Sequence, residues 1–216
     1  MKTISTLLTA AALSASLLIA TNNANATLID QGATVYDNDL GISWLKNANL
    51  AASDTFGVGG INAGGTMSWN TAQSWIGAMN TDNYQGYSDW RLPTSDTTCA
   101  GYNCTGSEMG HLFYTELGGA AGSSITTTHN ANYSLFSNLQ SNGYWSGTEY
   151  APSPTSAWDF YFSGGVQLAG GKNGDFFALA VRPGQAGAAV PEPAGLALFG
   201  IGLLGLMAGR RRLALR

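Results

Sequence analysis

Two apolar segments, one at each end, set the strongest limit on how this chain of 216 residues can fold. Residues 1–26 begin with Lys2, continue through an apolar stretch and end in small residues at Ala24 and Ala26. This pattern is typical of a secretory signal peptide cleaved after Ala26; an N-terminal membrane anchor is the alternative, but the apolar stretch is short for one. Residues 194–209 are also uncharged. We therefore expect one folded body between the two segments, within residues 27–183.

The second apolar segment is predicted to cross a membrane. As a helix, residues 194–209 would be about 24 Å long, somewhat less than a hydrocarbon core of about 30 Å. Bilayer thinning and flanking arginines can close such a gap. Three arginines follow at 210–212 and favour the cytoplasmic side, which places the body on the other side of the membrane.

The order of features at the C-terminus resembles a sorting signal. A proline–acid–proline step precedes the glycine-rich apolar run and the arginine cluster; it consists of Val190, Pro191, Glu192 and Pro193. This order is similar to that of PEP-CTERM signals. The resemblance implies a Gram-negative bacterium that makes exopolysaccharide, transient anchoring in the inner membrane, and cleavage by an exosortase near the Pro-Glu-Pro. An ordinary tail anchor is the alternative, and residues 184–189 read as a flexible linker.

The central part of the chain is aromatic and acidic. All six tryptophans lie between Trp44 and Trp158, which indicates a packed core rather than disorder. Between Asp30 and Asp175 there are twelve acidic residues, against four basic ones in the stretch that ends at Arg182. Because nucleic-acid binding depends on basic contacts to phosphate, this balance excludes a nucleic-acid partner and favours a cation or a neutral or cationic ligand.

Hydrophobic spacing predicts an α+β domain. Short strands are expected at 34–36 and 42–45, joined by turn residues. A helix capped by Ser68 should bury Trp69, Ala72, Ile76 and Met79, and a helix capped by Ser107 and ended by Gly118 or Gly119 should bury Met109, Leu112, Phe113 and Leu117. Helices early and antiparallel strands late argue against a βαβ sheet.

The later strands follow an alternating pattern. Residues 144–150 are rich in strand formers, and residues 158–162 place Trp158, Phe160 and Phe162 on one face. A hairpin turn at Gly164-Gly165 leads into a return strand with Val166 and Leu168. A last strand is expected to bury Phe177, Leu179 and Val181.

The two cysteines predict a local disulfide. Cys99 and Cys104 are close in sequence, and an exported protein meets an oxidising environment. His111 and His129 are the only imidazoles and have no recognisable metal-ligand spacing to the cysteines, so no metal site is predicted. Residues 37–41 resemble the start of a calcium loop but lack the full pattern; a capped turn is expected there, with calcium as the alternative.

A series of motifs in the body resembles the Lcl C-terminal domain family. The series runs "GISWLKNANLA", "GYSDWRLPT", "YWSGTEY", "AWDFYFSGG" and "AVRPG", and spans roughly residues 41–182. The resemblance implies a C-type-lectin-like fold with two helices and a twisted antiparallel sheet. It also implies glycan binding, since one branch binds sulfated polysaccharide. Four basic residues in the body argue against a sulfated ligand, and no calcium–sugar motif of true C-type lectins occurs.

The segment "DWRLPT" reads as structural. Pro93 fixes its own φ and favours an extended Leu92, which alternates with Arg91 and Trp90. We expect Trp90 and Leu92 in the core and Arg91 paired with an acid such as Asp89 or Glu149, with ligand binding by Arg91 as the alternative.

Loops and exposed aromatic rings suggest where a ligand would bind. No nucleophile turn, zinc-protease motif or phosphate-binding loop is present, so no catalytic residue is predicted, and a carboxylate-based glycoside hydrolase is the remaining enzyme alternative. A polar loop at 170–175 and nearby aromatic residues suit a sugar, with core packing of the tryptophan as the alternative. The predicted ligand face consists of Trp145, Tyr150, Lys172, Asn173 and Asp175.

These observations predict an exported binding module for glycan or exopolysaccharide at the cell surface or in the extracellular matrix. Signal peptidase, an exosortase, the inner membrane and the exopolysaccharide are the expected partners. A structural matrix protein without a small ligand is the alternative, and no cofactor is expected.

Overall fold

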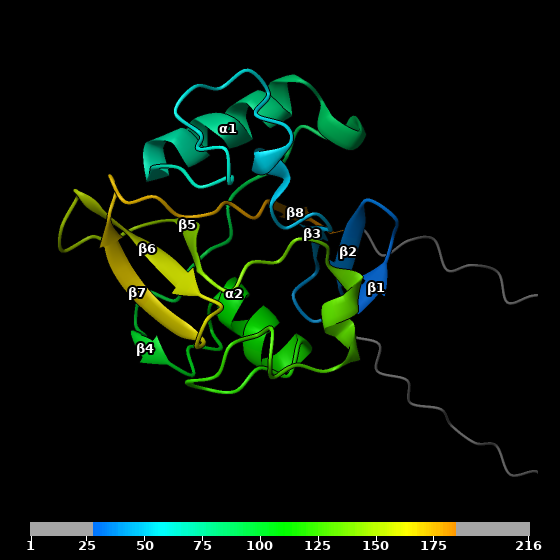
Figure 1. Cartoon of the computed structure of the whole chain (residues 1–216), viewed down its shortest axis with the longest axis vertical. Helices are drawn as coiled ribbons and strands as arrows, with labels where there is room; N and C mark the ends of the chain where they lie inside the picture. The colour runs from blue at the N-terminus through cyan, green and yellow to red at the C-terminus, as the bar shows by residue number, and fades with distance from the viewer. Residues whose placement is uncertain (1–27, 185–216) are drawn as a thin grey trace, which may run out of the picture.

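The computed structural model describes residues 28–184, and these residues form two four-stranded antiparallel sheets with two helices (Figure 1). The predicted signal peptide, processing residues, membrane segment and nearly all of the predicted linker lie outside this range. Within residues 28–184, no helix is both long and apolar enough to cross a bilayer. The α+β class is confirmed.

The first sheet joins the beginning and the end of the described chain. Its strand order is β1-β2-β3-β8, with the bounds β1 Leu28–Asp30, β2 Thr34–Asp37, β3 Ile42–Leu45 and β8 Val181–Pro183. Strands β2 and β3 are buried along their whole length, including the polar side chains of Thr34, Asp37 and Ser43. The two short strands predicted at 34–36 and 42–45 are confirmed as β2 and β3. The return of β8 to pair with this N-terminal hairpin was not predicted.

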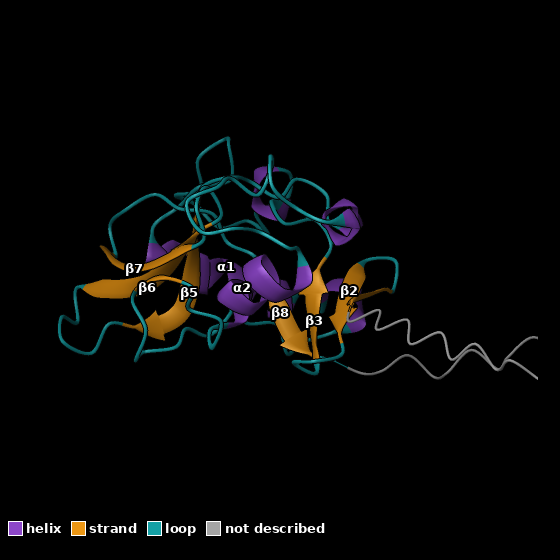
Figure 2. Cartoon of the chain, turned by 90° about the horizontal axis from the view of Figure 1, so that it is seen from below, coloured by secondary structure: helices purple, strands orange, loops and turns teal. Residues whose placement is uncertain are grey.

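The second sheet is built from the later strands. Its order is β4-β7-β6-β5, with the bounds β4 Gly101–Tyr102, β5 Gly143–Glu149, β6 Ser156–Tyr161 and β7 Val166–Gly171. The predicted hairpin is confirmed: Gly165 has a φ of +74°, and β6 pairs with β7 in register from Ser156 to Tyr161. Figure 2 shows the two sheets side by side. In Figure 1, α1 lies at the top of the molecule and α2 in its lower part.

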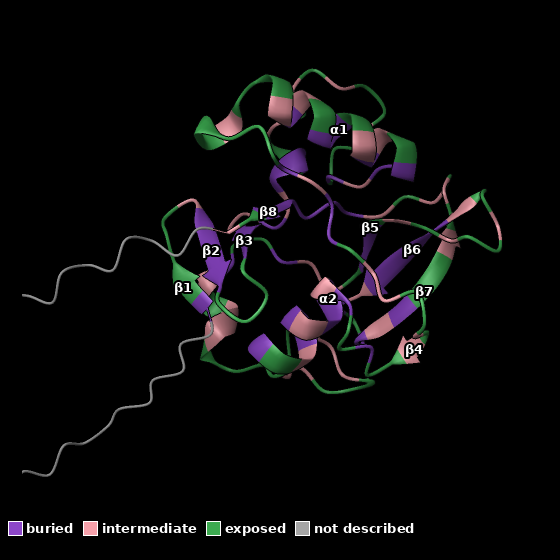
Figure 3. Ribbon diagram, turned by 180° about the vertical axis from the view of Figure 1, so that it is seen from behind, coloured by how far each residue is buried: buried purple, intermediate pink, exposed green. Residues whose placement is uncertain are grey.

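Helix α1 is the predicted first helix. It spans Trp69–Thr81, and the side chain of its N-cap Ser68 accepts a hydrogen bond from the backbone N–H of Thr71. Its buried face contains the four predicted residues together with Trp75, while the opposite face is exposed (Figure 3). Capping and apolar periodicity are local properties, so this helix can be derived from sequence.

The second helix changes its winding partway along. Helix α2 spans Glu108–His111 with Ser107 as its N-cap, and a π-helical segment, η3, continues over Leu112–Glu116. In η3, the backbone N–H of Leu117 donates to the carbonyl of Leu112, five residues back, at 2.9 Å. The four predicted apolar residues are buried, and Gly118 follows with a φ of +69°. The wider winding was not predicted from sequence.

Three 3₁₀ turns complete the elements: η1 Leu50–Ala52, η2 Tyr84–Gly86 and η4 Ala131–Leu135.

The core is one continuous cluster shared by both sheets and both helices. Large buried aromatic side chains dominate it, which explains why the tryptophans are confined to this part of the chain; the largest are Trp44, Trp75, Trp145, Tyr144, Phe113, Phe160 and Phe162.

The predicted last strand is shorter than expected. Only Val181–Pro183 forms β8, and residues 178–180 are buried without strand pairing. Ahead of them, Phe177 makes an isolated parallel bridge to Tyr144. These residues cross from one sheet to the other through the core, so they are apolar throughout rather than alternating.

The "DWRLPT" segment connects the sheets to both helices. Trp90 and Leu92 are buried, as predicted. Arg91, however, pairs with Glu108: two 2.7 Å hydrogen bonds join its Nη1 and Nη2 to the two carboxylate oxygens. Asp89 instead accepts from Arg182 at 2.8 Å. The expected pairing of Arg91 with an acid is confirmed, but the partner is Glu108 rather than either of the named examples, Asp89 and Glu149. Neighbours in an extended strand point to opposite sides, and Glu149 pairs with Lys172.

Candidate ligand-binding surface

Two hollows flank the loop of residues 150–155, which connects β5 to β6. The first, here called the tyrosine hollow, has a volume of about 420 Å³; it is lined by Thr97, Thr98, Cys99, Ala100, Tyr150, Ala151, Pro152 and Trp158. The second, here called the lysine hollow, has a volume of about 680 Å³; it is lined by Ser68, Asn70, Thr155, Gly171, Lys172 and Asn173. Both volumes fall in the range typical of ligand pockets.

The tyrosine hollow combines aromatic edges with hydroxyl groups. The rings of Tyr150 and Trp158 pack edge to face, with centroids 5.1 Å apart. Trp158 is 5% exposed, so it supports Tyr150 and offers only an edge to the hollow. Thr97 and Thr98 are exposed on the facing loop. Aromatic carbon and hydroxyl oxygen together suit a sugar, which has apolar C–H faces and many hydroxyls.

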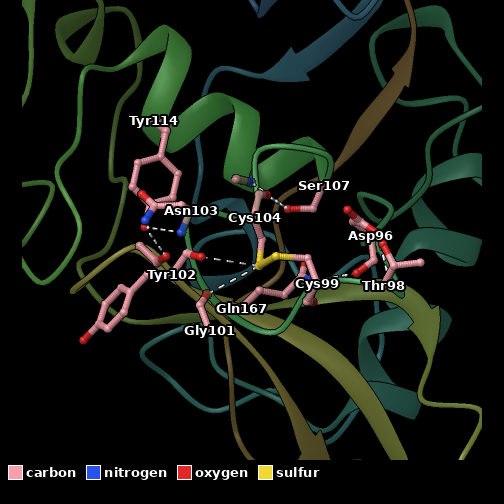
Figure 4. The surroundings of a disulfide bond; sticks show 12 residues. Asp96, Thr98, Cys99, Gly101, Tyr102, Asn103, Cys104, Ser107, Tyr114 and Gln167 are labelled. Atoms are coloured by element: carbon pink, nitrogen blue, oxygen red, sulfur yellow. Dashed lines mark hydrogen bonds between the residues drawn. A yellow bond between two sulfur atoms is a disulfide. The ribbon is translucent and has the colours of Figure 1, made fainter.

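The facing wall of the tyrosine hollow is held rigidly. The predicted disulfide between Cys99 and Cys104 is present, and Gln167 Nε2 donates to the carbonyls of Asp96 at 2.8 Å and Cys99 at 2.6 Å (Figure 4). The carboxylate of Asp96 accepts hydrogen bonds from the hydroxyl and the backbone N–H of Thr98, which lower the pKa of Asp96 below its ordinary value. A wall fixed in advance loses less conformational entropy when a ligand binds.

The lysine hollow lies at the start of α1. Lys172 Nζ is 2.6 Å from Glu149 Oε1 and 4.3 Å from the centroid of the Trp69 ring. The carbonyl of Lys172 accepts from the Trp69 backbone N–H at 2.9 Å, and its own N–H donates to Thr155 at 2.9 Å. The cation is therefore already paired and its backbone is tied to both neighbours, so this hollow presents a neutralised charge rather than a free one.

A buried carboxyl group lies close to the strand that borders the lysine hollow. Asp159 on β6 is 1% exposed, and neither of its carboxylate oxygens has a hydrogen-bond partner among the described residues. Burial raises the pKa of Asp159 to about 7, although the nearby backbone N–H of Gly170 acts in the lowering direction without reaching hydrogen-bond geometry. Burial, and then the charge of Asp159, also raise the pKa of Tyr161.

The predicted ligand face is divided by the structure. Tyr150 lines one hollow, whereas Lys172 and Asn173 line the other. Asp175 is exposed but lines neither hollow. Trp145 is fully buried, and its indole N–H donates to the carbonyl of Met67 at 2.8 Å, so its placement on a ligand face is corrected to the core. Its alternating strand position could not distinguish an exposed ring from one covered by Phe176, whose ring centroid lies 4.6 Å away.

Two contributors to the hollows were missed from sequence. Trp158 was assigned only to a sheet face, and the Thr97–Thr98 wall lies far from Tyr150 in the chain. The predicted disulfide was the one signal that could have identified this loop as an ordered surface.

The loop of residues 37–41 forms the expected capped turn: Asp37 Oδ1 accepts from the backbone N–H groups of Asp39 and Leu40.

Comparison with known families agrees with this architecture. The model of the Lcl C-terminal domain matches residues 33–182, so the chain belongs to that family. The PEP-CTERM protein-sorting motif matches residues 189–212. A search of curated proteins finds no match. The motif marks an exported protein that an exosortase processes at the membrane.

Proposed function

We propose that the exported protein is a glycan-binding module of the cell surface or extracellular matrix and that the tyrosine hollow is its contact site. The observation that carries the proposal is the position of Tyr150 beside Trp158, opposite a wall fixed by a disulfide and two hydrogen bonds. The two paired sorting segments of the sequence support a location outside the cytoplasm. Binding without catalysis, and a C-type-lectin-like variant of the α+β fold, are parts of the same proposal.

The charge of the body indicates which glycans fit. Four basic residues face twelve acidic ones between Asp30 and Arg182. All four bases already take part in ion pairs, namely Lys46, Arg91, Lys172 and Arg182. Sulfated glycans need charge-assisted bonds from such side chains, so neutral polysaccharide is the ligand class that we assign.

A glycan array carrying neutral and sulfated oligosaccharides tests the proposal, followed by binding measurements on the best neutral ligand. Tyr150→Ala should weaken binding at least tenfold because the aromatic contact is lost, with an unchanged circular dichroism spectrum. Tyr102→Ala is the matched control, since Tyr102 is 53% exposed but lines neither hollow. Absence of binding to every glycan, or equal losses in both variants, would overturn the proposal. Concentration-dependent assembly without glycan would instead favour a structural matrix protein.

A further inference from the structure

Away from both hollows, three metal-ligating side chains meet between the first sheet and the second helix. They are Asp37 at the end of β2, His111 at the end of α2 and Glu116 at the end of η3. One ligand atom from each lies within 4.8 Å of the other two. It is the one group of this kind among residues 28–184. The site is independent of the proposed glycan contact.

The local structure positions these side chains before any ion arrives. The Asp37 carboxylate is held by the two backbone N–H groups of its own turn and by the Trp44 indole N–H, which donates to Oδ2 at 3.2 Å. The π-helical winding of η3 brings His111 and Glu116 onto one side, with His111 Nε2 3.2 Å from Glu116 Oε1. An α-helix turns about 100° per residue and would place residues five apart on different faces. Such π-helical turns occur frequently at functional sites.

Burial makes the charge of this cluster costly. The side chain of Glu116 is 0% exposed, Asp37 is fully buried, and the side chain of His111 is 15% exposed. Buried charges in proteins are paired or coordinate metals. A divalent cation bound with a neutral imidazole would balance the charges of both carboxylates.

We propose that Asp37, His111 and Glu116 form a binding site for a divalent first-row transition ion, represented here by Zn²⁺. One imidazole nitrogen and two carboxylate oxygens form a mixed donor set that suits zinc better than calcium or magnesium, which prefer oxygen alone. Zinc bonds of about 2.1 Å require ligand atoms no more than about 4.2 Å apart, so side-chain shifts of less than about 1 Å complete the site. The partial exposure of His111 provides the entry path.

Two histidines in the whole chain allow a direct test. The ¹⁵N-labelled exported protein is dialysed against chelator and titrated with ZnCl₂ at pH 7, while imidazole nitrogens are followed by NMR and bound metal by mass spectrometry. We expect one Zn²⁺ per chain and a large shift of the His111 ring nitrogens. His129, whose Nδ1 lies 2.7 Å from the Ile125 carbonyl and whose ring stacks on Tyr133, should not respond.

Matched variants separate this site from adventitious binding. His111→Gln and Asp37→Asn should weaken Zn²⁺ binding at least tenfold, and His129→Gln should leave it unchanged. Zn²⁺ should also raise the melting temperature of the native protein but not that of His111→Gln. If Asp37→Asn or His111→Gln folds poorly, a rise in melting temperature with Zn²⁺ in both the native and the His129→Gln proteins still supports the site. No Zn²⁺ response of the His111 ring up to millimolar metal would overturn the proposal. Binding that depends on His129, or binding of Ca²⁺ in preference to Zn²⁺, would overturn it equally.

Discussion

Two aspartates, one in each sheet, are equally buried but have opposite surroundings. Asp37 ends β2 in the first sheet, and its carboxylate accepts three hydrogen bonds, from two backbone N–H groups and the Trp44 indole. Asp159 lies within β6 of the second sheet, and among residues 28–184 its oxygens have no partner. Covered by similar amounts of protein, one carboxylate has fixed donors and the other has none.

The difference shows that the number of donors, rather than burial alone, determines whether a buried acid stabilises the fold. A buried group pays for its lost hydration unless hydrogen bonds replace it, and an ionisable group can also avoid the cost by taking up a proton. For Asp37, hydrogen bonds replace the lost hydration. Asp159 lacks such donors and takes up a proton more readily, which is why burial raises its pKa to about 7.

Removing the better-supported carboxylate should have the largest effect. Asp37→Ala removes the acceptor for three donors, and hydrogen bonds to a charged group contribute about 1.5–3 kcal/mol each, so we expect the free energy of unfolding to fall by about 5 kcal/mol. Urea denaturation in the presence of EDTA measures this without a contribution from metal. Asp39→Ala, an exposed change in the same turn, should cost less than about 0.5 kcal/mol. Similar losses in the two variants would contradict the assigned role of Asp37.

The unsupported carboxyl should make stability depend on pH. The pKa of Asp159 is raised from 3.8 to about 7, so between these values the folded state holds a proton that the unfolded state has lost. Stability should therefore be greatest below pH 4 with respect to this group and should decrease as the pH rises to 7. At about 1.4 kcal/mol per pKa unit, this decrease in the free energy of unfolding can be no more than about 4 kcal/mol. We expect about 3 kcal/mol, because local relaxation reduces the effect.

Asp159→Asn should remove this decrease, because the amide does not ionise. Urea denaturation at several pH values between 4 and 8 compares the native protein with Asp159→Asn and with Asp175→Asn, an exposed aspartate that should leave the dependence intact. If the decrease persists in Asp159→Asn, the carboxyl is not the group responsible.

The capped turn around Asp37 was predicted from the sequence, but the surroundings of Asp159 were not, although much of the fold was. Helix α1 with its Ser68 cap, the β6–β7 hairpin and the disulfide depend on residues close together in the chain, and all three were predicted. The donors to Asp37 are also partly local, since Asp39 and Leu40 belong to its own turn. Asp159 lies in the strand predicted from the alternation of residues 158–162, and alternation does not say what covers each face.

Long-range pairing explains most of the errors. Arg91 finds Glu108 and Arg182 finds Asp89 through tertiary packing rather than through neighbouring positions. The burial of Trp145 depends on Phe176, which follows two strands later. The meeting of Asp37 and His111 with Glu116 depends on the π-helical winding and on the position of the first sheet, neither of which leaves a periodic signal.

The edges of the two sheets extend the comparison. Edge strand β4 is short and pairs with β7 through only two residue pairs, and the disulfide between Cys99 and Cys104 encloses it. Edge strand β1 ends at Asp30, which pairs with Lys46 at 2.7 Å. One edge is therefore held covalently and the other by an exposed ion pair.

The covalent tie should be the more important of the two. Cys99→Ala/Cys104→Ala should lower the free energy of unfolding by about 2 kcal/mol, the amount expected from the chain entropy of so small a ring. Because Cys99 lines the tyrosine hollow, the double variant should also weaken glycan binding. Urea denaturation and amide hydrogen exchange at Gly101 and Tyr102 measure the effect. Unchanged exchange at β4 would show that the two hydrogen bonds from Gln167 hold the loop without the disulfide.

The ion pair at the other edge should contribute least. The side chains of Lys46 and Asp30 are 32% and 43% exposed, and such pairs contribute about 0.2–1 kcal/mol, so Lys46→Ala should cost about 0.5 kcal/mol, and less at high salt. The hydrogen bond from Lys46 is the main cause of the lowered pKa of Asp30, and that from Gly32 the second, so the variant should move this pKa partly back toward 3.8. The stabilisation is present above pH 4 and is lost as acid protonates Asp30. NMR titration of the Asp30 carboxyl measures the shift, and an unmoved pKa would show that the turn at Gly32, rather than the ion pair, supports this edge.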